Sequence, residues 1–183
     1  MYAVYGDVKE ELPPNMPEPK GKPVRTTTFV DANLMHDLTT GRSCSGILHF
    51  VNATPIDWFS KRQNTVETAT YGSEFTVARQ GTDHIIDLCY TLRMLGVPLE
   101  GPAWMFGDNK SVITSSNIPH LPLTKRHNAL AYHRVREAIA AGILYFLHMD
   151  GVDNPADLLT KFLPWAVARA FIEPLLLWRG ETN

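Results

Sequence analysis

Apolar and β-branched residues come in short runs over the segment that begins at residue 25. Residues 25–33 (RTTTFVDAN), 43–51 (SCSGILHFV) and 56–61 (IDWFSK) have this composition, which is typical of β-strands. The connections LTTGRS and NATP between them are short. Because short connections join antiparallel neighbours, we predict a three-stranded antiparallel meander.

The spacing of the apolar positions changes in the next segment. Seven residues fall at steps of three and four, namely Tyr71, Phe75, Ala78, Thr82, Ile85, Cys89 and Leu92. This spacing predicts a long amphipathic helix that ends at Gly96. Asn64 or Thr65 would cap its start, with Glu67 or Thr68 in the first turn.

The remaining segments alternate between strand and helix patterns. Residues 102–108 (PAWMFGD) and 143–148 (ILYFLH) predict a fourth and a fifth strand, and helices are expected at residues 111–117, 127–142, 154–163 and 166–178. In the helix at 127–142 we expect Leu130, His133, Val135 and Ile139 to share one face. The last strand follows its helix by a crossover, so it can lie parallel to a neighbour. This order predicts an α/β domain with a mixed sheet.

The ends of the chain differ from its middle in composition. Residues 1–24 contain the proline-rich stretch ELPPNMPEPKGKP, which excludes helix and interior strand and predicts an extended lead-in. We therefore divide the chain into a proline-rich lead-in (1–24), one α/β domain (25–163) and a C-terminal helical extension (164–183).

Composition and charge exclude several classes of protein. With 183 residues, 44% of them hydrophobic, the chain can bury the core of one ordinary domain. Its two cysteines, without a CxxC spacing, argue against a disulfide scaffold or a structural zinc site. Neither a membrane span nor a targeting signal is seen, so we expect an intracellular protein, cytoplasmic or nuclear, without a membrane partner. The net charge of −2 reports a sum and says nothing about where basic residues gather.

Four acidic residues stand at unusual places in this pattern. Asp31 lies inside the first strand, Glu74 beside the apolar stripe of the long helix, Asp108 at the end of the fourth strand, and Asp157 two residues after Pro155. Each has an ordinary explanation: an edge strand, a helix flank, a turn, or the favourable end of a helix dipole.

Taken together, the four carboxylates favour a metal site. If they met on one face of the sheet they would repel one another, and a pair of divalent cations would relieve that repulsion. Mg²⁺ prefers oxygen ligands, and two such ions about 3.5–4 Å apart promote phosphodiester hydrolysis. Both interpretations, separate structural roles and a shared metal site, stay open at this point.

Five motifs identify a family that the chain resembles. FVDAN, SKRQNTVETATYGSEF, GDNKSV, KRHNALAYHRVREA and NPADLLTK occur in the order seen in the ribonuclease H domain of copia-type retrotransposon polyproteins. The resemblance covers residues 28–163 and implies the ribonuclease H-like fold, a mixed five-stranded sheet with helices on both faces. It also implies that Asp31, Glu74, Asp108 and Asp157 bind two Mg²⁺ ions, for which Mn²⁺ can substitute. Gly107 departs from the family, where cysteine is common before the DN pair.

The resemblance further implies a substrate and a partner. Family members cut the RNA strand of RNA:DNA hybrids, and a reverse transcriptase domain normally precedes this domain in the polyprotein. Residues that could contact the hybrid are Lys61, Arg62, Gln63, Asn64, Asn109, Lys125 and Arg126, each of which also suits a solvated loop, helix cap or helix face. His127 and His148 are candidate general acids, but the family's loop histidine has no counterpart here.

Two other functions are compatible with the same residues. An inactive retroelement relic would keep the fold and bind nucleic acid or a partner without cleaving. A nuclease of the integrase type also uses acidic residues and two metal ions, although the SKRQ and ADLLTK motifs favour ribonuclease H.

Overall fold

The first three strands form the predicted antiparallel meander. The computed structural model describes residues 9–118, 120–121, 123 and 128–176. β1 (Thr26–Asp37) pairs with β2 (Arg42–Val51), and β2 pairs with β3 (Thr54–Arg62), all antiparallel. β1 continues past the predicted end at Asn33, through a register shift between Asn33 and Asp37.

Two parallel strands complete the sheet on the other side of β1. β4 (Ala103–Gly107) pairs parallel with β1, and β5 (Leu144–His148) pairs parallel with β4. The strand order is β3-β2-β1-β4-β5, so β1 occupies the centre. The prediction of an α/β fold with a mixed five-stranded sheet is confirmed.

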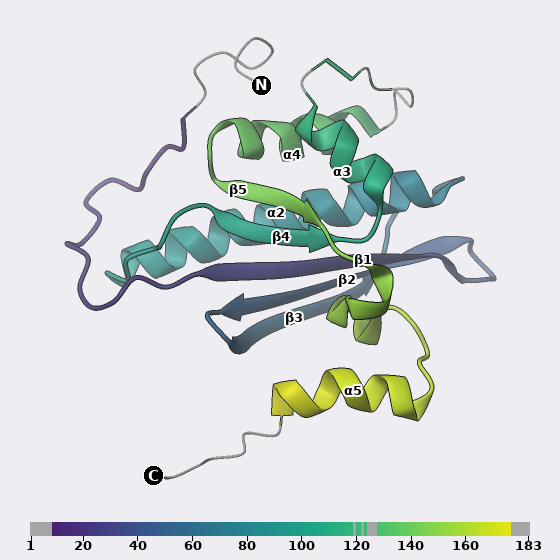
Figure 1. The fold of residues 1–183 in the computed structure, drawn as a ribbon. Helices are drawn as coiled ribbons and strands as arrows, with labels where there is room; N and C mark the ends of the chain where they lie inside the picture. Colours follow the sequence, from purple (N-terminus) through teal and green to yellow (C-terminus); the bar gives the residue numbers. More distant parts are fainter. Residues whose placement is uncertain (1–8, 119, 122, 124–127, 177–183) are drawn as a thin grey trace.

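One face of the sheet is covered by α2 (Thr70–Met94), with α3 (Lys110–Asn117) and α4 (Ala129–Ala140) beside it (Figure 1). The core between these layers includes Val30, Ile47 and Phe75, each 1% exposed or less. A Cβ atom at Gly81 would lie 2.8 Å from Val30 Cγ1, so the glycine permits the close approach of α2 to β1.

The opposite face of β1 and β2 carries a shorter element. After the single turn η2 (Gly151–Asp153), the 3-10 helix η3 (Pro155–Leu159) packs on both strands. α5 (Trp165–Leu176) follows and lies next to η3, away from the sheet (Figure 1). Helical elements therefore lie on both faces, as predicted.

The predicted start of the long helix was wrong. α2 begins at Thr70, its N-cap is Ala69 rather than Asn64 or Thr65, and no side chain caps it. The Gln63 N–H instead donates to the Ser43 carbonyl, which extends the β-type pairing. The buried Glu67 then folds back over the first turn: a Cβ at Gly72 would lie 2.1 Å from Glu67 Oε2.

Of the four residues predicted to share one face of α4, Val135 and Ile139 do pack on the core, but Leu130 and His133 are exposed. Leu130 is 80% exposed, whereas Arg136 is 1% exposed. The Arg136 guanidinium donates to the carbonyls of Ser115 and Ile118 and stacks over the Tyr132 ring. An arginine that donates to carbonyls in α3 and directly after it can be buried, although it is charged.

The segment NPADLLTKFL forms a 3-10 helix of five residues instead of a longer α-helix. The Thr160 N–H donates to the Asp157 carbonyl at a spacing of three residues, which is the 3-10 pattern. Thr160 and Lys161 then turn toward Asp31, so the segment cannot continue as a regular helix.

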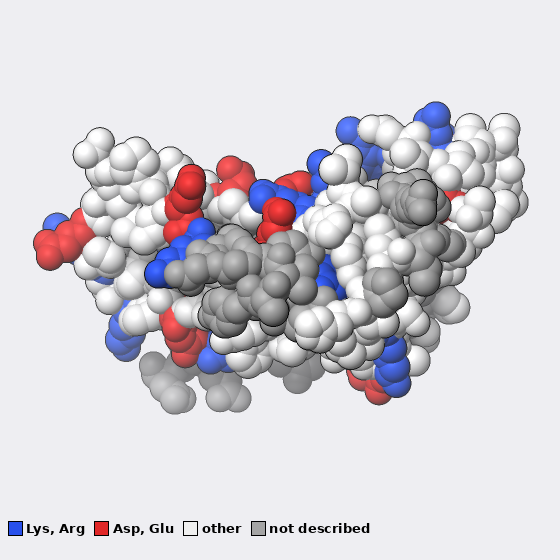
Figure 2. All heavy atoms as spheres, turned by 90° about the horizontal axis from the view of Figure 1, so that it is seen from above, with Lys and Arg blue, Asp and Glu red and all other residues white. Residues whose placement is uncertain are grey.

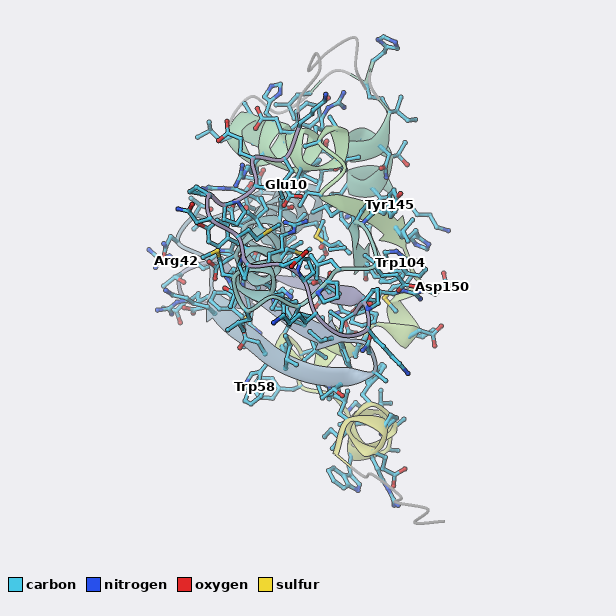
Figure 3. All side chains as sticks on the ribbon, turned by 90° about the vertical axis from the view of Figure 1, so that its left-hand side faces the viewer. Glu10, Arg42, Trp58, Trp104, Tyr145 and Asp150 are labelled. Carbon is cyan, nitrogen blue, oxygen red and sulfur yellow. The ribbon has the colours of Figure 1, made fainter. Side chains whose placement is uncertain are left out.

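In the described part of the chain, no helix can span a membrane, and charges of both signs are mixed on one face. Among the described residues, no helix has both the length and the apolar character to cross a bilayer. Figure 2 shows basic and acidic side chains interspersed on the face seen from above. Trp58, on β3, is 69% exposed and points away from the body of the molecule, whereas Trp104 and Tyr145 occupy paired positions on β4 and β5 (Figure 3).

Candidate metal centre

Asp31 and Asp108 meet because their strands are parallel neighbours. Phe29 on β1 is in register with Phe106 on β4, and each aspartate stands two residues further along its strand direction. β4 ends at Gly107, so Asp108 follows the carboxyl end of β4 at the level of Asp31 in the middle of β1, and the two side chains converge there. Asp31 is 1% exposed and lies in the central strand, which excludes the edge-strand explanation of this residue.

Glu74 reaches the same place from α2. It lies near the start of that helix and is 5% exposed. One carboxylate oxygen from each of Asp31, Glu74 and Asp108 lies within 4.8 Å of the others, a group that could hold a metal ion. Two strands and one helix thus bring together three of the four predicted ligands.

Asp157 joins the cluster through a lysine. Lys161 Nζ lies 2.7 Å from Asp157 Oδ1 and 3.3 Å from Asp31 Oδ1. The Thr160 hydroxyl donates to the other oxygen of Asp31. The sequence interpretation assigned no role to Thr160 or Lys161. The i, i+4 spacing of Asp157 and Lys161 was the available signal, since such pairs face each other on a helical segment.

A buried asparagine fixes η3 beside β1. Asn154 is fully buried; its Nδ2 donates to the Val30 carbonyl at 2.9 Å, and its Oδ1 accepts from the Ala156 N–H at 3.1 Å. The same side chain therefore caps η3 and attaches it to the strand that carries Asp31. This contact places Asp157 near the other acids.

Gly46 makes the close packing of η3 possible. It is paired with Asp31 across β1 and β2, and a Cβ there would lie 2.6 Å from Thr160 Cγ2 and 2.9 Å from the Ala156 carbonyl oxygen. We expect Gly46→Ala to push η3 away and to lower the free energy of unfolding by about 1–3 kcal/mol. Urea denaturation measures this change, and unaltered stability would contradict the packing.

Burial, followed by neighbouring charges, raises the pKa values of three of these acids, Glu74, Asp108 and Asp157. Burial is the largest cause that raises the pKa of Glu74 well above its usual range, followed by the charges of Asp31 and Asp108. Burial and then Asp31 raise the pKa of Asp108, while Lys161 opposes the shift. Burial also raises the pKa of Asp157, against its hydrogen bond from Lys161. Crowded carboxylates of this kind favour the binding of a cation.

The predicted substrate-facing residues lie in different environments. Lys61 is exposed on β3, Arg62 is exposed and ion-paired with Asp37, and Asn64 is exposed in the following loop. Asn109 caps α3, because its Oδ1 accepts from the N–H groups of Ser111 and Val112. Lys125, Arg126 and His127 lie outside the described residues.

Gln63 differs from the expectation of a solvated loop. It is 1% exposed, and its Nε2 donates to Ser45 Oγ and to the Ser73 carbonyl, each at 3.0 Å. The side chain therefore joins β2 to the start of α2 in the interior, because Gln63 continues the β-type pairing instead of leaving the sheet.

Sequence comparison finds relatives among transposon proteins. The chain is 28% identical over 142 residues to the Retrovirus-related Pol polyprotein from transposon RE2 of Arabidopsis thaliana, and 29% identical over 136 residues to that from transposon TNT 1-94 of Nicotiana tabacum. These alignments cover 78% and 74% of the chain, but the chain spans only about one tenth of the length of these relatives. No family model matches.

Structure comparison finds the same fold in solved ribonucleases H. The N-terminal RNase H domain of a Mycobacterium tuberculosis protein, fused to maltose-binding protein, superposes with a TM-score of 0.56 at 12% identity, covering 82% of this chain and 97% of that chain. LC11-RNase H1 in complex with RNA/DNA hybrid gives a TM-score of 0.56 at 11% identity, covering 74% and 94%.

The motifs, the strand order and the two comparisons all point to the ribonuclease H-like fold. The sequence similarity is distant and covers about three-quarters of the chain, and the solved neighbours share the fold. The chain thus has the ribonuclease H-like fold, and its sequence is distantly similar to the Pol polyproteins of the transposons RE2, RE1 and TNT 1-94.

Proposed function

We propose that the chain is a metal-dependent endonuclease that hydrolyses the RNA strand of RNA:DNA hybrids. The observation that carries this proposal is the convergence of Asp31, Glu74 and Asp108 within 4.8 Å in a ribonuclease H-like fold. A solved neighbour with this fold was crystallised with an RNA/DNA hybrid, which supports the choice of substrate.

The donor set suits magnesium. Asp31, Glu74, Asp108 and Asp157 offer only carboxylate oxygens, which Mg²⁺ and Mn²⁺ prefer over softer ligands. Asp31 and Asp157 already hold one cation between them, the Lys161 ammonium, which a metal ion bridging these two acids would displace. Two bound divalent ions would stabilise the attacking and leaving oxygens of the phosphodiester and lower the pKa of the attacking water.

The residues of the chain would position both the ions and the substrate. Asp31 lies on β1 and Asp108 directly after β4, while Glu74 comes from α2 and Asp157 from η3. Lys61 on β3 lies two strands away from Ala32 on β1, at about 10 Å, because both residues pair with Ser45 on β2. Ala32 directly follows Asp31, so Lys61 is near the proposed metal site. We propose phosphate or sugar contacts for Lys61, Arg62, Asn64 and Asn109, to which Lys125 and Arg126 add basic charge. The buried Gln63 is not part of this set.

The direct test is cleavage of a hybrid by the purified chain. With Mg²⁺ or Mn²⁺ we expect endonucleolytic products from the labelled RNA strand, and we expect EDTA to abolish them. A hybrid that stays intact over a range of salt concentrations would contradict the catalytic proposal. Binding of the hybrid without cleavage would instead support an inactive relic.

Two controls separate related functions. Double-stranded DNA of the same sequence should stay intact. Cleavage of that DNA would instead favour an integrase-type nuclease. The chain spans about one tenth of its curated relatives, so we also propose the reverse transcriptase part of such a polyprotein as a partner. Adding that part should leave the cleavage chemistry unchanged and raise the affinity for hybrid.

A further inference from the structure

A second group of possible metal ligands lies away from the carboxylate cluster. His49 on β2, Asp57 on β3 and His84 on α2 line an open cavity of about 410 Å³, together with Asp83 and Asp87. His49 is paired with Thr28, three residues before Asp31 on β1, or about 10 Å along the strand. Thr28 and His49 share the face of the sheet that α2 covers, whereas Asp31 contacts Thr160 and Lys161, which follow η3 on the other face.

The two imidazole rings have the spacing of metal ligands. His49 Nε2 and His84 Nδ1 are 3.5 Å apart, and an oxygen of Asp57 completes a set in which all ligand atoms lie within 4.8 Å of one another. A tetrahedral zinc ion with Zn–N distances of about 2.0–2.1 Å separates two nitrogens by about 3.3–3.4 Å. The separation of the two nitrogens therefore fits one shared ion, and the rings, which now face each other at hydrogen-bond distance, would have to turn so that both lone pairs point at it.

Neighbouring groups orient two of the three ligands. Thr28 Oγ1 lies 2.8 Å from His49 Nδ1, so an Nδ1–H that donates to it leaves the lone pair of Nε2 facing His84. This is the outer hydrogen bond that metal-binding histidines usually make. On Asp57, Oδ1 accepts from the Trp58 N–H at 2.9 Å, which leaves Oδ2 available.

The charges around the cavity favour a cation. His49 is 2% exposed, and the carboxylate of Asp57 beside it supplies a negative charge. Asp83 is already paired with Arg134 and Arg79, whereas the exposed Asp87 faces the cavity one helical turn after His84.

We propose that His49, Asp57 and His84 bind one transition-metal ion, for which Zn²⁺ is the best fit. Two imidazoles and one carboxylate are typical zinc ligands, while Mg²⁺ prefers the oxygen-only cluster. Water or Asp87 would occupy the fourth position. Because the ligands come from β2, β3 and α2, the bound ion would join the antiparallel half of the sheet to the long helix.

Zinc binding by the whole chain tests this site, independently of any hydrolysis. Titration calorimetry with Zn²⁺, in excess Mg²⁺ to occupy the carboxylate cluster, should show one equivalent bound and a rise in melting temperature. Co²⁺ in place of Zn²⁺ should give the absorption of a tetrahedral site. We expect His84→Ala and Asp57→Asn each to weaken binding at least about tenfold, of the order seen when metal sites lose a supporting group.

Matched variants make the result decisive. His120→Ala removes an exposed histidine outside the cavity and should bind Zn²⁺ like the wild type. Asp57 is exposed, so Asp57→Asn keeps the fold if His84→Ala disturbs it. Less than one equivalent of Zn²⁺, an octahedral Co²⁺ spectrum, or unchanged binding in both variants would overturn the proposal.

Discussion

Asp108→Asn should abolish most of the hybrid cleavage while leaving the fold intact. The substitution keeps the size of the side chain but removes one of the three carboxylates that converge within 4.8 Å. A bound metal ion stabilises the transition-state charge by several kcal/mol. Since each 1.36 kcal/mol is a factor of ten in rate, we expect cleavage to fall about 10²–10⁴-fold.

The measurement is single-turnover cleavage of a labelled hybrid at saturating enzyme, with hybrid affinity measured separately. Hybrid affinity should stay equal or rise, because one negative charge near the phosphates is gone. Asp153→Asn is the matched control: Asp153 is exposed in η2, between β5 and η3, outside the cluster. Equal losses in the two variants, or wild-type rates in Asp108→Asn, would show that the cluster does not perform the chemistry.

The strands and the long helix could be predicted because their patterns are local. The β-branched run around Asp31 and the three-and-four spacing after Tyr71 each correspond to one buried face, and the structure confirms both. The start of α2 could not be predicted in this way. It depends on Gln63 and Glu67, whose buried positions come from contacts with Ser45 and Gly72 on other segments.

For the candidate site, the sequence predicted which residues take part but not how they come together. The sequence pointed to Asp31, Glu74, Asp108 and Asp157, and the structure brings the first three together with Asp157 attached through Lys161. The convergence itself depends on the parallel pairing of β1 with β4, which no local pattern contains. The cavity at His49, Asp57 and His84 went unrecognised because its ligands are separated in sequence and carry no motif.

Glu74→Gln should stabilise the metal-free protein, although it removes a proposed metal ligand. Glu74 is 5% exposed, and burial together with Asp31 and Asp108 raises its pKa well above the usual range. Glutamine keeps an oxygen that can accept from the Ala32 N–H and carries no charge. We expect a gain of about 0.5–2 kcal/mol, in the range of other stabilising substitutions, which raises the melting temperature by about 2–4 °C per kcal/mol for a domain of this size.

The free energy of unfolding of the metal-free wild type should depend on pH through Glu74. A carboxyl group with a raised pKa binds more protons in the folded state than in the unfolded state, so stability falls as pH rises between the two pKa values. For the wild type without metal, the contribution of Glu74 should therefore be lost as pH rises from its unfolded value near 4.5 through the raised folded pKa. Glu74→Gln should remove that decline.

Magnesium distinguishes this explanation from a general gain in packing. An ion that binds only the folded state stabilises it by an amount that grows with the logarithm of ion concentration over Kd. Mg²⁺ should therefore raise the melting temperature of the wild type at neutral pH and that of Glu74→Gln far less. Glu137→Gln, the same change on the exposed face of α4, should stay within about 0.5 kcal/mol of the wild type with or without Mg²⁺. If Glu74→Gln instead lowers the metal-free stability, Glu74 contributes more through its hydrogen bond than it loses by repulsion. The carboxylates would then stabilise the metal-free fold through their hydrogen bonds, instead of destabilising it by repulsion that a metal ion relieves.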